Sequence, residues 1–113
     1  MRPRPLTQQA QQAVGQVLRP GERAVDATVG NGHDTLFLAR QVVPGGRVIG
    51  FDVQPRALAT AQTRLAASGL QHIVELQLCG HQQMRDRVPV DWPGRVGAVM
   101  FNLAAVLELT LFG

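Results

Sequence analysis

The spacing of hydrophobic and polar residues predicts helices and short strands in regular alternation. Apolar residues at helical spacing from Ala10 to Leu18 predict a first helix, which Pro20-Gly21 ends. Short apolar runs predict strands over 22–28, 47–53, 72–79 and 95–103. Helical patterns fill the first two intervals between these strands, and a loop or short helix fills the third. Such alternation is typical of a parallel sheet with right-handed crossovers, so the predicted fold class is α/β.

The loop after the first predicted strand has the composition of a ligand-binding turn. In VDATVGNGHD (25–34), Gly30 and Gly32 allow the backbone to approach a ligand closely. The helix that follows offers unpaired N–H groups at its start. In doubly wound sheets, ligands bind beyond the carboxyl ends of the strands, where this loop is expected. An ordinary tight turn has the same glycine pattern, so a second signal is needed.

Asp52 provides the second signal at the end of the second predicted strand. It follows Gly32 by 20 residues, and an acid at about that distance typically accepts hydrogen bonds from ribose hydroxyls. Asp52 could instead cap the helix that begins near Pro55. The glycine loop and Asp52, at this spacing, together favour a ligand that contains adenosine.

Two residues distinguish between adenosine-containing ligands. Thr35 stands where a dinucleotide fingerprint has Gly or Ala. Asp26 places a carboxylate beside the loop, where it would repel a pyrophosphate but suit the sulfonium and ammonium groups of S-adenosylmethionine. The sequence therefore favours S-adenosylmethionine, and a NAD-dependent oxidoreductase is the alternative.

The two motifs also resemble those of a known family. VDATVGNGHDTLFLA followed by VIGFDVQPRAL is similar to the class I S-adenosylmethionine-dependent methyltransferases, and more narrowly to the rRNA methylase family. The resemblance covers about residues 10–103. It implies a Rossmann-like fold, S-adenosylmethionine as cofactor and an RNA substrate. Characterised family members methylate the aminomethyl group of a modified wobble uridine in tRNA, and rRNA is the other candidate substrate.

The resemblance implies cofactor-binding residues in three segments. They are Asp26, Thr28, Gly30, Asn31, Gly32, His33, Asp34 and Thr35 around the first loop, Asp52, Val53 and Gln54 after the second strand, and Gly80 and His81 after the third. Of these, Asp26, Gly30, Asn31 and Gly32 would line the methionine side, and Asp52 would hold the ribose. The residues near the adenine would be Val53, Gln54, Gly80 and His81.

Asn102, after the fourth predicted strand, is the implied catalytic residue, because it would face the methyl group and its acceptor. Each of four polar residues also has a simpler interpretation. His33 could cap the helix, Asp34 could interact with the helix dipole, His81 could be solvated, and Asn102 could cap the end of a strand.

Composition narrows the remaining possibilities. The chain has 113 residues, 45% of them hydrophobic, which predicts one domain over 1–113. The resemblance implies that this domain binds S-adenosylmethionine. All 11 basic residues are Arg and the net charge is +3, which favours a polyanionic partner only weakly. Arg85, Arg87 and Arg95 could contact RNA phosphates or be solvated. A single cysteine and the absence of a membrane-length apolar run predict a cytoplasmic protein without a metal cluster.

The end of the sequence departs from the family pattern. A class I fold normally has seven strands, whereas this chain has sequence for about four, expected in the order 3-2-1-4 with flanking helices. We therefore expect a truncated fold, with an exposed fourth strand and an atypical apolar tail over 104–113. A frameshifted or truncated gene product is the preferred explanation of this ending. The tail could fold back over the sheet, or the chain could form a homodimer through the exposed fourth strand or the tail. A non-catalytic S-adenosylmethionine-binding fragment is then the alternative to an active methyltransferase.

Overall fold

Four parallel strands and one antiparallel strand form a single sheet in the computed structural model, which describes residues 6–92, 96–101 and 104–106. The strands are β1 (Arg23–Asp26), β2 (Arg47–Asp52), β3 (Val74–Leu78), β4 (Val96–Phe101) and β5 (Ala104–Val106). Their order across the sheet is β3-β2-β1-β4-β5. The predicted α/β class and the order 3-2-1-4 of the parallel strands are confirmed.

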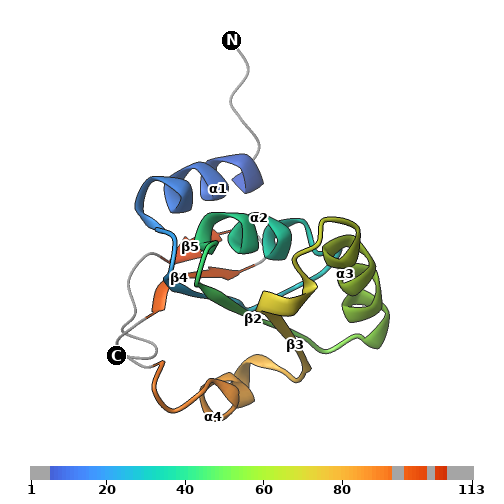
Figure 1. Ribbon diagram of the computed structural model, residues 1–113. Helices are drawn as coiled ribbons and strands as arrows, with labels where there is room; N and C mark the ends of the chain where they lie inside the picture. Colours follow the sequence, from blue (N-terminus) through green and yellow to red (C-terminus); the bar gives the residue numbers. More distant parts are fainter. Residues whose placement is uncertain (1–5, 93–95, 102–103, 107–113) are drawn as a thin grey trace.

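Helices cover both faces of this sheet (Figure 1). The longer helices α1 (Leu6–Val17), α2 (His33–Val42) and α3 (Pro55–Ala67) lie on one face, and the short helix α4 (Met84–Arg87) lies on the other. Two 3-10 turns, Gln71–Ile73 and His81–Gln83, flank β3. Among the described residues, no helix is long and apolar enough to cross a membrane.

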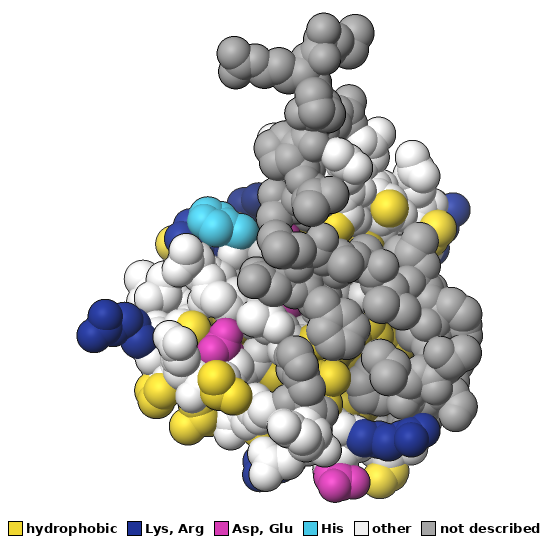
Figure 2. Space-filling view, turned by 180° about the vertical axis from the view of Figure 1, so that it is seen from behind, with side chains coloured by type: hydrophobic (Ala, Val, Ile, Leu, Met, Phe, Trp, Pro, Cys, Tyr) yellow, Lys and Arg dark blue, Asp and Glu magenta, His cyan; other side chains and the backbone are white. Residues whose placement is uncertain are grey.

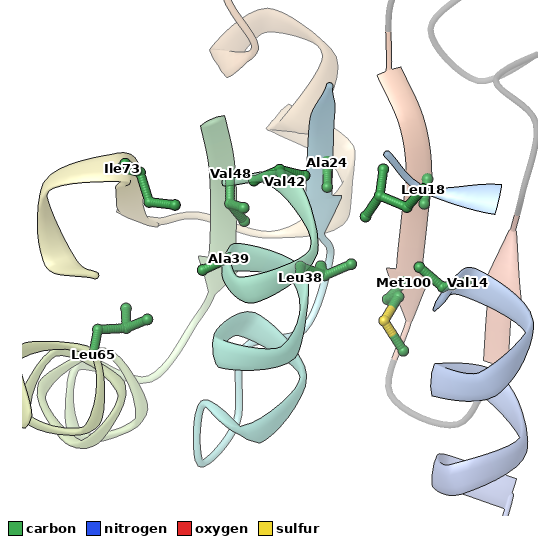
Figure 3. Close-up of a cluster of buried hydrophobic side chains, with 11 residues drawn as sticks. Val14, Leu18, Ala24, Leu38, Ala39, Val42, Val48, Leu65, Ile73 and Met100 are labelled. Carbon is green, nitrogen blue, oxygen red and sulfur yellow. The ribbon is translucent and has the colours of Figure 1, made fainter. Parts of the chain in front are cut away.

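Alternating side chains of the strands build one hydrophobic cluster on each face. Figure 3 shows the cluster beneath the three longer helices, where Val14, Leu38 and Leu65 meet Ala24 and Val48 of the sheet. The opposite cluster joins Val25, Ile49 and Phe51 to Met84 and Trp92. Because β1 and β2 are buried on both faces, they read in the sequence as nearly continuous apolar runs.

A bulge at Gly97 adjusts the alternation in β4. Arg23 of β1 pairs with Val96, but Ala24 pairs with Ala98, so one residue of β4 is skipped. As a result Val96 and Val99 belong to one cluster, whereas Ala98 and Met100 belong to the other. The bulge lets β4 bury apolar side chains on both faces despite the extra residue.

The expectation that β4 is an exposed edge is wrong for the described residues. Ala104–Val106 pair with residues 99–101 in antiparallel register, so β5 uses the backbone groups along the outer side of β4. A reversal of the chain after β4 satisfies hydrogen-bonding groups that would otherwise face solvent. The rest of the predicted tail, 107–113, lies outside the described residues, and dimerisation through it stays a prediction.

The third strand begins later than the sequence suggested. Residues 71–73 form a 3-10 turn, and β3 begins only at Val74. Val74 and Leu76 pack at the border of the cluster under the helices, but the side chain of Leu78 is 53% exposed. Only the first part of β3 therefore packs against the core, because β3 is the outermost strand on this side of the sheet.

Candidate cofactor site

Asp26 closes β1 with a carboxylate that is buried beneath the first loop. Its side chain is only 1% exposed. The hydroxyl of Thr35 donates a hydrogen bond to Oδ2 of Asp26 at 2.6 Å, and the backbone N–H of Thr28 donates to Oδ1 at 3.2 Å. Asp26 thus connects the start of the loop to the first turn of α2.

Burial changes the acidity of this carboxyl group. Loss of solvation raises the pKa of Asp26 to about 7, against a lowering effect of the hydrogen bonds from Thr35 and Thr28. The negative charges of Asp34 and Asp52 raise it slightly further. Asp26 therefore titrates near neutral pH, unlike a carboxylate at the protein surface.

Asp52 closes β2 and holds the loop from the other side. Its Oδ2 accepts a hydrogen bond from the backbone N–H of Gly30 at 2.9 Å, and its Oδ1 accepts one from Gln54 at 2.9 Å. The residue is partly exposed. A carboxylate oxygen can accept two hydrogen bonds, so each oxygen of Asp52 retains capacity for a ligand hydroxyl.

The loop itself depends on two glycines with positive φ. Gly30 has φ +54° and Gly32 has φ +86°, and both values favour glycine. A Cβ atom at Gly32 would lie 2.8 Å from Cα of Ala61, because the start of α2 packs directly on α3. On the outer side, Nε of Arg64 donates to the carbonyl of Asn31 at 2.9 Å. The loop conformation is thus fixed from three sides.

Two cavities adjoin the loop at the carboxyl ends of the strands. The first, here called the β2 cavity, has a volume of about 350 Å³ and is lined by Ala27, Thr28, Asp52, Val53, Cys79, Gly80 and Gln82. The second, here called the loop cavity, has a volume of about 440 Å³ and is lined by Gln11, Thr28, Val29, Gly30, Asn31, His33 and Asp34. Thr28 lines both cavities, so they adjoin at this residue.

The structure brings most of the predicted cofactor residues to these cavities. Thr28, Gly30, Asn31, His33 and Asp34 line the loop cavity, and Asp52, Val53 and Gly80 line the β2 cavity. The roles expected of these residues stay predictions.

The other predicted site residues lie outside the cavity linings. Asp26 and Thr35 are buried behind the loop, and Gly32 is a buried residue of the loop itself. Gln54 is exposed beside Asp52. His81 opens a 3-10 turn next to Gly80. Asn102 lies outside the described residues.

Sequence reasoning missed two glutamines of the cavity walls. Nε2 of Gln11 in α1 donates to Oδ1 of Asp34 at 2.7 Å, which joins the first helix to the loop cavity. Gln82 follows Gly80 and lines the β2 cavity. Both lie on polar positions of helical segments, and only the folded arrangement distinguishes them from solvated side chains. Cys79 is buried in the core and also contributes to the β2 cavity.

The described residues contain no group of three or more His, Cys, Asp or Glu side chains that could hold a metal ion. The site residues described above are carboxylates, backbone amides and a glycine loop.

The parallel strand order 3-2-1-4, with its loop and carboxylates at the ends of β1 and β2, defines the Rossmann-like fold of the class I S-adenosylmethionine-dependent methyltransferases. A family model described as "Putative rRNA methylase" matches residues 48–104, which is half of the chain. The chain belongs to this family.

Similar proteins of known structure support the assignment. A protein of the same description from Clostridium thermocellum is 40% identical, with a TM-score of 0.80, over 89% of this chain and 52% of that chain. A methyltransferase from Streptococcus mutans, solved in complex with SAH, is 33% identical with a TM-score of 0.77, over 100% of this chain and 59% of that one.

One curated relative has a name that states its own substrate. The chloroplastic tRNA (mnm(5)s(2)U34)-methyltransferase of Arabidopsis thaliana is 34% identical over 96 residues, which is 78% of this chain and 34% of that protein. The chain thus spans about half the length of the solved relatives and about a third of this curated one.

Proposed function

We propose that this chain is the S-adenosylmethionine-binding part of a methyltransferase that acts on RNA, and that residues 1–113 form one such domain. The adenosine would occupy the β2 cavity, where Asp52 has capacity to accept hydrogen bonds from ribose hydroxyls. The methionine end would occupy the loop cavity. Because the two cavities adjoin at Thr28, a single ligand with two ends fits their arrangement.

One observation carries the proposal: two backbone N–H groups at the start of the loop donate hydrogen bonds to carboxylates of the protein itself. Gly30 N–H donates to Asp52, and Thr28 N–H donates to Asp26. In a phosphate-binding loop, such amides point toward the anion. Here they face carboxylates, so the loop favours a ligand with positive charge over a pyrophosphate. This arrangement disfavours the NAD-dependent alternative.

Asp34 is the carboxylate best placed to meet the ammonium group of the ligand. It lines the loop cavity, whereas Asp26 lies behind the loop. Oδ1 of Asp34 is oriented by the side-chain amide of Gln11 at 2.7 Å, which leaves Oδ2 for a cation. We therefore propose that Asp26 holds the loop in place and that Asp34 binds the positive charge of the ligand. The sequence pattern did not distinguish these two roles.

S-adenosylmethionine would supply an already activated methyl group, so the protein's task is to align acceptor and donor. An amine acceptor must be neutral to attack. We propose that Asn102 orients the N–H group of such an acceptor. Relatives named as acting on RNA are the Arabidopsis tRNA methyltransferase and ribosomal RNA small subunit methyltransferase H from Anaeromyxobacter, 51% identical over 59 residues. The aminomethyl group of a tRNA wobble uridine and a base of rRNA are therefore the candidate acceptors.

Calorimetry with S-adenosylhomocysteine and with NAD tests the cofactor assignment. We expect saturable binding of S-adenosylhomocysteine and no heat with NAD. Binding of NAD alone would overturn the proposal. Transfer of a labelled methyl group to undermodified tRNA or rRNA then separates an enzyme from a non-catalytic binding domain. Saturable cofactor binding without transfer to either RNA would support the binding domain.

A further inference from the structure

Arg23 and Arg47 lie side by side at the amino ends of the parallel strands, opposite the carboxyl ends that carry the cofactor loop. They are the first residues of β1 and β2, and they are partners in the register of these two parallel strands. Partners in register point to the same face, and neighbouring strands are only about 4.8 Å apart. The two guanidinium groups therefore start from adjacent positions on the face that carries α4.

Neither guanidinium has a carboxylate partner among the described residues. Nη1 of Arg23 donates to the carbonyl of Gly21 at 3.0 Å, and its Cζ atom lies 5.9 Å from the ring centroid of Trp92. Nη1 of Arg47 donates to the carbonyl of His72 at 3.5 Å. Like charges opposite one another on neighbouring strands destabilise a sheet. A bound anion would offset this repulsion.

A cavity of about 490 Å³ opens at the same place, here called the amino-edge cavity. Its polar and aromatic lining comes from Arg23, Arg47, His72, Glu75 and Trp92. Glu75 is the acidic member, and its carboxylate accepts a hydrogen bond from the amide of Gln77. The cavity thus combines two guanidinium groups and an imidazole with one carboxylate that already has a partner.

Positive charge is dispersed on the face of the molecule that Figure 2 shows. There, the dark blue Arg side chains lie apart from one another near the rim of the molecule. Arg85 and Arg87 are exposed on α4, and Arg95 lies outside the described residues. The register pair of Arg23 and Arg47 therefore offers a concentrated positive site that the net charge alone did not indicate.

We propose that the amino-edge cavity binds phosphate groups of an RNA backbone, at a site separate from the cofactor loop. Guanidinium groups present fixed donors that match phosphate oxygens, and Arg23 is held in place by Gly21 and Trp92. RNA is the chosen source of phosphate on the basis of the proposed function. Strands of four to six residues place the amino and carboxyl ends of the sheet roughly 13–20 Å apart, a span that an RNA stem-loop can bridge and a free nucleotide cannot.

Trp92 is the only tryptophan of the chain and lines this cavity, so its fluorescence reports binding there. The experiment titrates the full chain, without cofactor, with a stem-loop RNA and separately with inorganic phosphate. Arg47→Gln and Arg23→Gln are the test variants, and Arg40→Gln, at an exposed position of α2, is the matched control. We expect a several-fold weaker RNA affinity for each test variant. The slope of log affinity against log salt should fall by about one per lost phosphate contact.

Equal RNA affinity and equal salt slopes for Arg40→Gln and the two test variants would overturn the site. A change in Trp92 fluorescence with phosphate but not with RNA would overturn RNA as the ligand. Arg47 is exposed, so its substitution should leave folding intact even if Arg23→Gln does not. Calorimetry with S-adenosylhomocysteine on the same variants keeps the two proposals distinct. Cofactor binding should be unchanged in Arg47→Gln, and its absence in the wild type would count against the proposed function alone.

Discussion

The hydroxyl of Thr35 lies 2.6 Å from the carboxylate of Asp26, and both side chains are almost completely buried. This contact joins the first turn of α2 to the end of β1, directly behind the glycine loop. It also gives Thr35 a function at a position where a dinucleotide-binding protein has Gly or Ala to bring helix and strand together. Here a hydrogen bond, rather than the absence of a side chain, fixes the helix against the sheet.

Removal of this hydroxyl should destabilise the protein. Thr35→Val keeps the shape of the side chain but leaves Oδ2 of Asp26 buried without its donor, which should cost about 1–3 kcal/mol. Thr35→Ser should retain most of the stability that the hydrogen bond provides. Thr63→Val is the matched control, because its hydroxyl bonds an exposed helical carbonyl, that of Ala59. Urea unfolding measures all three, and equal stability of Thr35→Val and Thr63→Val would contradict the role of the contact.

The stability of the protein should fall as the pH rises through neutrality. Burial raises the pKa of Asp26 to about 7 in the folded state, above its ordinary value of 3.8. A raised pKa contributes stability that is fully present below the unfolded value and is lost as pH rises through the folded value. From pH 5 to pH 8 the loss should be about 2–3 kcal/mol.

Asp26→Asn tests this pH dependence, since the amide cannot ionise. Urea unfolding at pH 5 and pH 8 should show a smaller decrease in the free energy of unfolding for the variant than for the wild type. The comparison between the two proteins cancels the contributions of other titrating groups. Identical decreases would show that Asp26 does not titrate in this range.

Loss of the Asp52 carboxylate should weaken cofactor binding. Asp52→Ala removes the acceptor for the N–H groups of Gly30 and Gln54, as well as the proposed partner of the ribose. We expect affinity for S-adenosylhomocysteine to fall by roughly tenfold or more, in line with the loss of hydrogen bonds to a charged group. Asp86→Ala, an exposed carboxylate on α4, controls for the change in net charge. Calorimetry should separate the two variants, and similar affinities would remove Asp52 from the site.

The two loop glycines should differ in their tolerance of a methyl group. Gly30→Ala has open space around the new Cβ atom and should cost about 1–2 kcal/mol from its positive φ. Gly32→Ala has the same conformational cost, and its Cβ atom would also lie 2.8 Å from the backbone of Ala61. The close contact should add about 1–3 kcal/mol. Thermal unfolding of both variants tests the order, and a more stable Gly32→Ala would contradict the packing of α2 on α3.

Much of the fold follows from local sequence signals. Gly30, Gly32 and Pro55 mark the starts of α2 and α3, and apolar runs mark the buried strands β1 and β2. The return of the chain as β5 was not specified by pattern, because Ala104–Val106 reads equally as helix or strand. Backbone pairing with β4, a tertiary effect, is what distinguishes the strand.

The candidate site was predictable in position but not in internal geometry. Strand-end acids and a glycine loop indicate where a ligand binds, and both cavities adjoin that loop. Spacing could not show that Asp26 faces Thr35 whereas Asp34 faces a cavity, since this depends on the direction of each side chain. The pairing of Arg23 with Arg47 could likewise not be predicted from the sequence, because the two residues are 24 positions apart.

Thr28 is common to both cavities, so the proposed cofactor site consists of two half-sites that adjoin at this residue. A nucleoside and an amino acid supplied as separate molecules would each gain only the contacts of one half. Their covalent connection makes occupation of the second half intramolecular, so affinity rises through effective concentration without any additional contact. A larger side chain at this boundary would therefore reduce the advantage of the connected ligand more than the binding of either fragment.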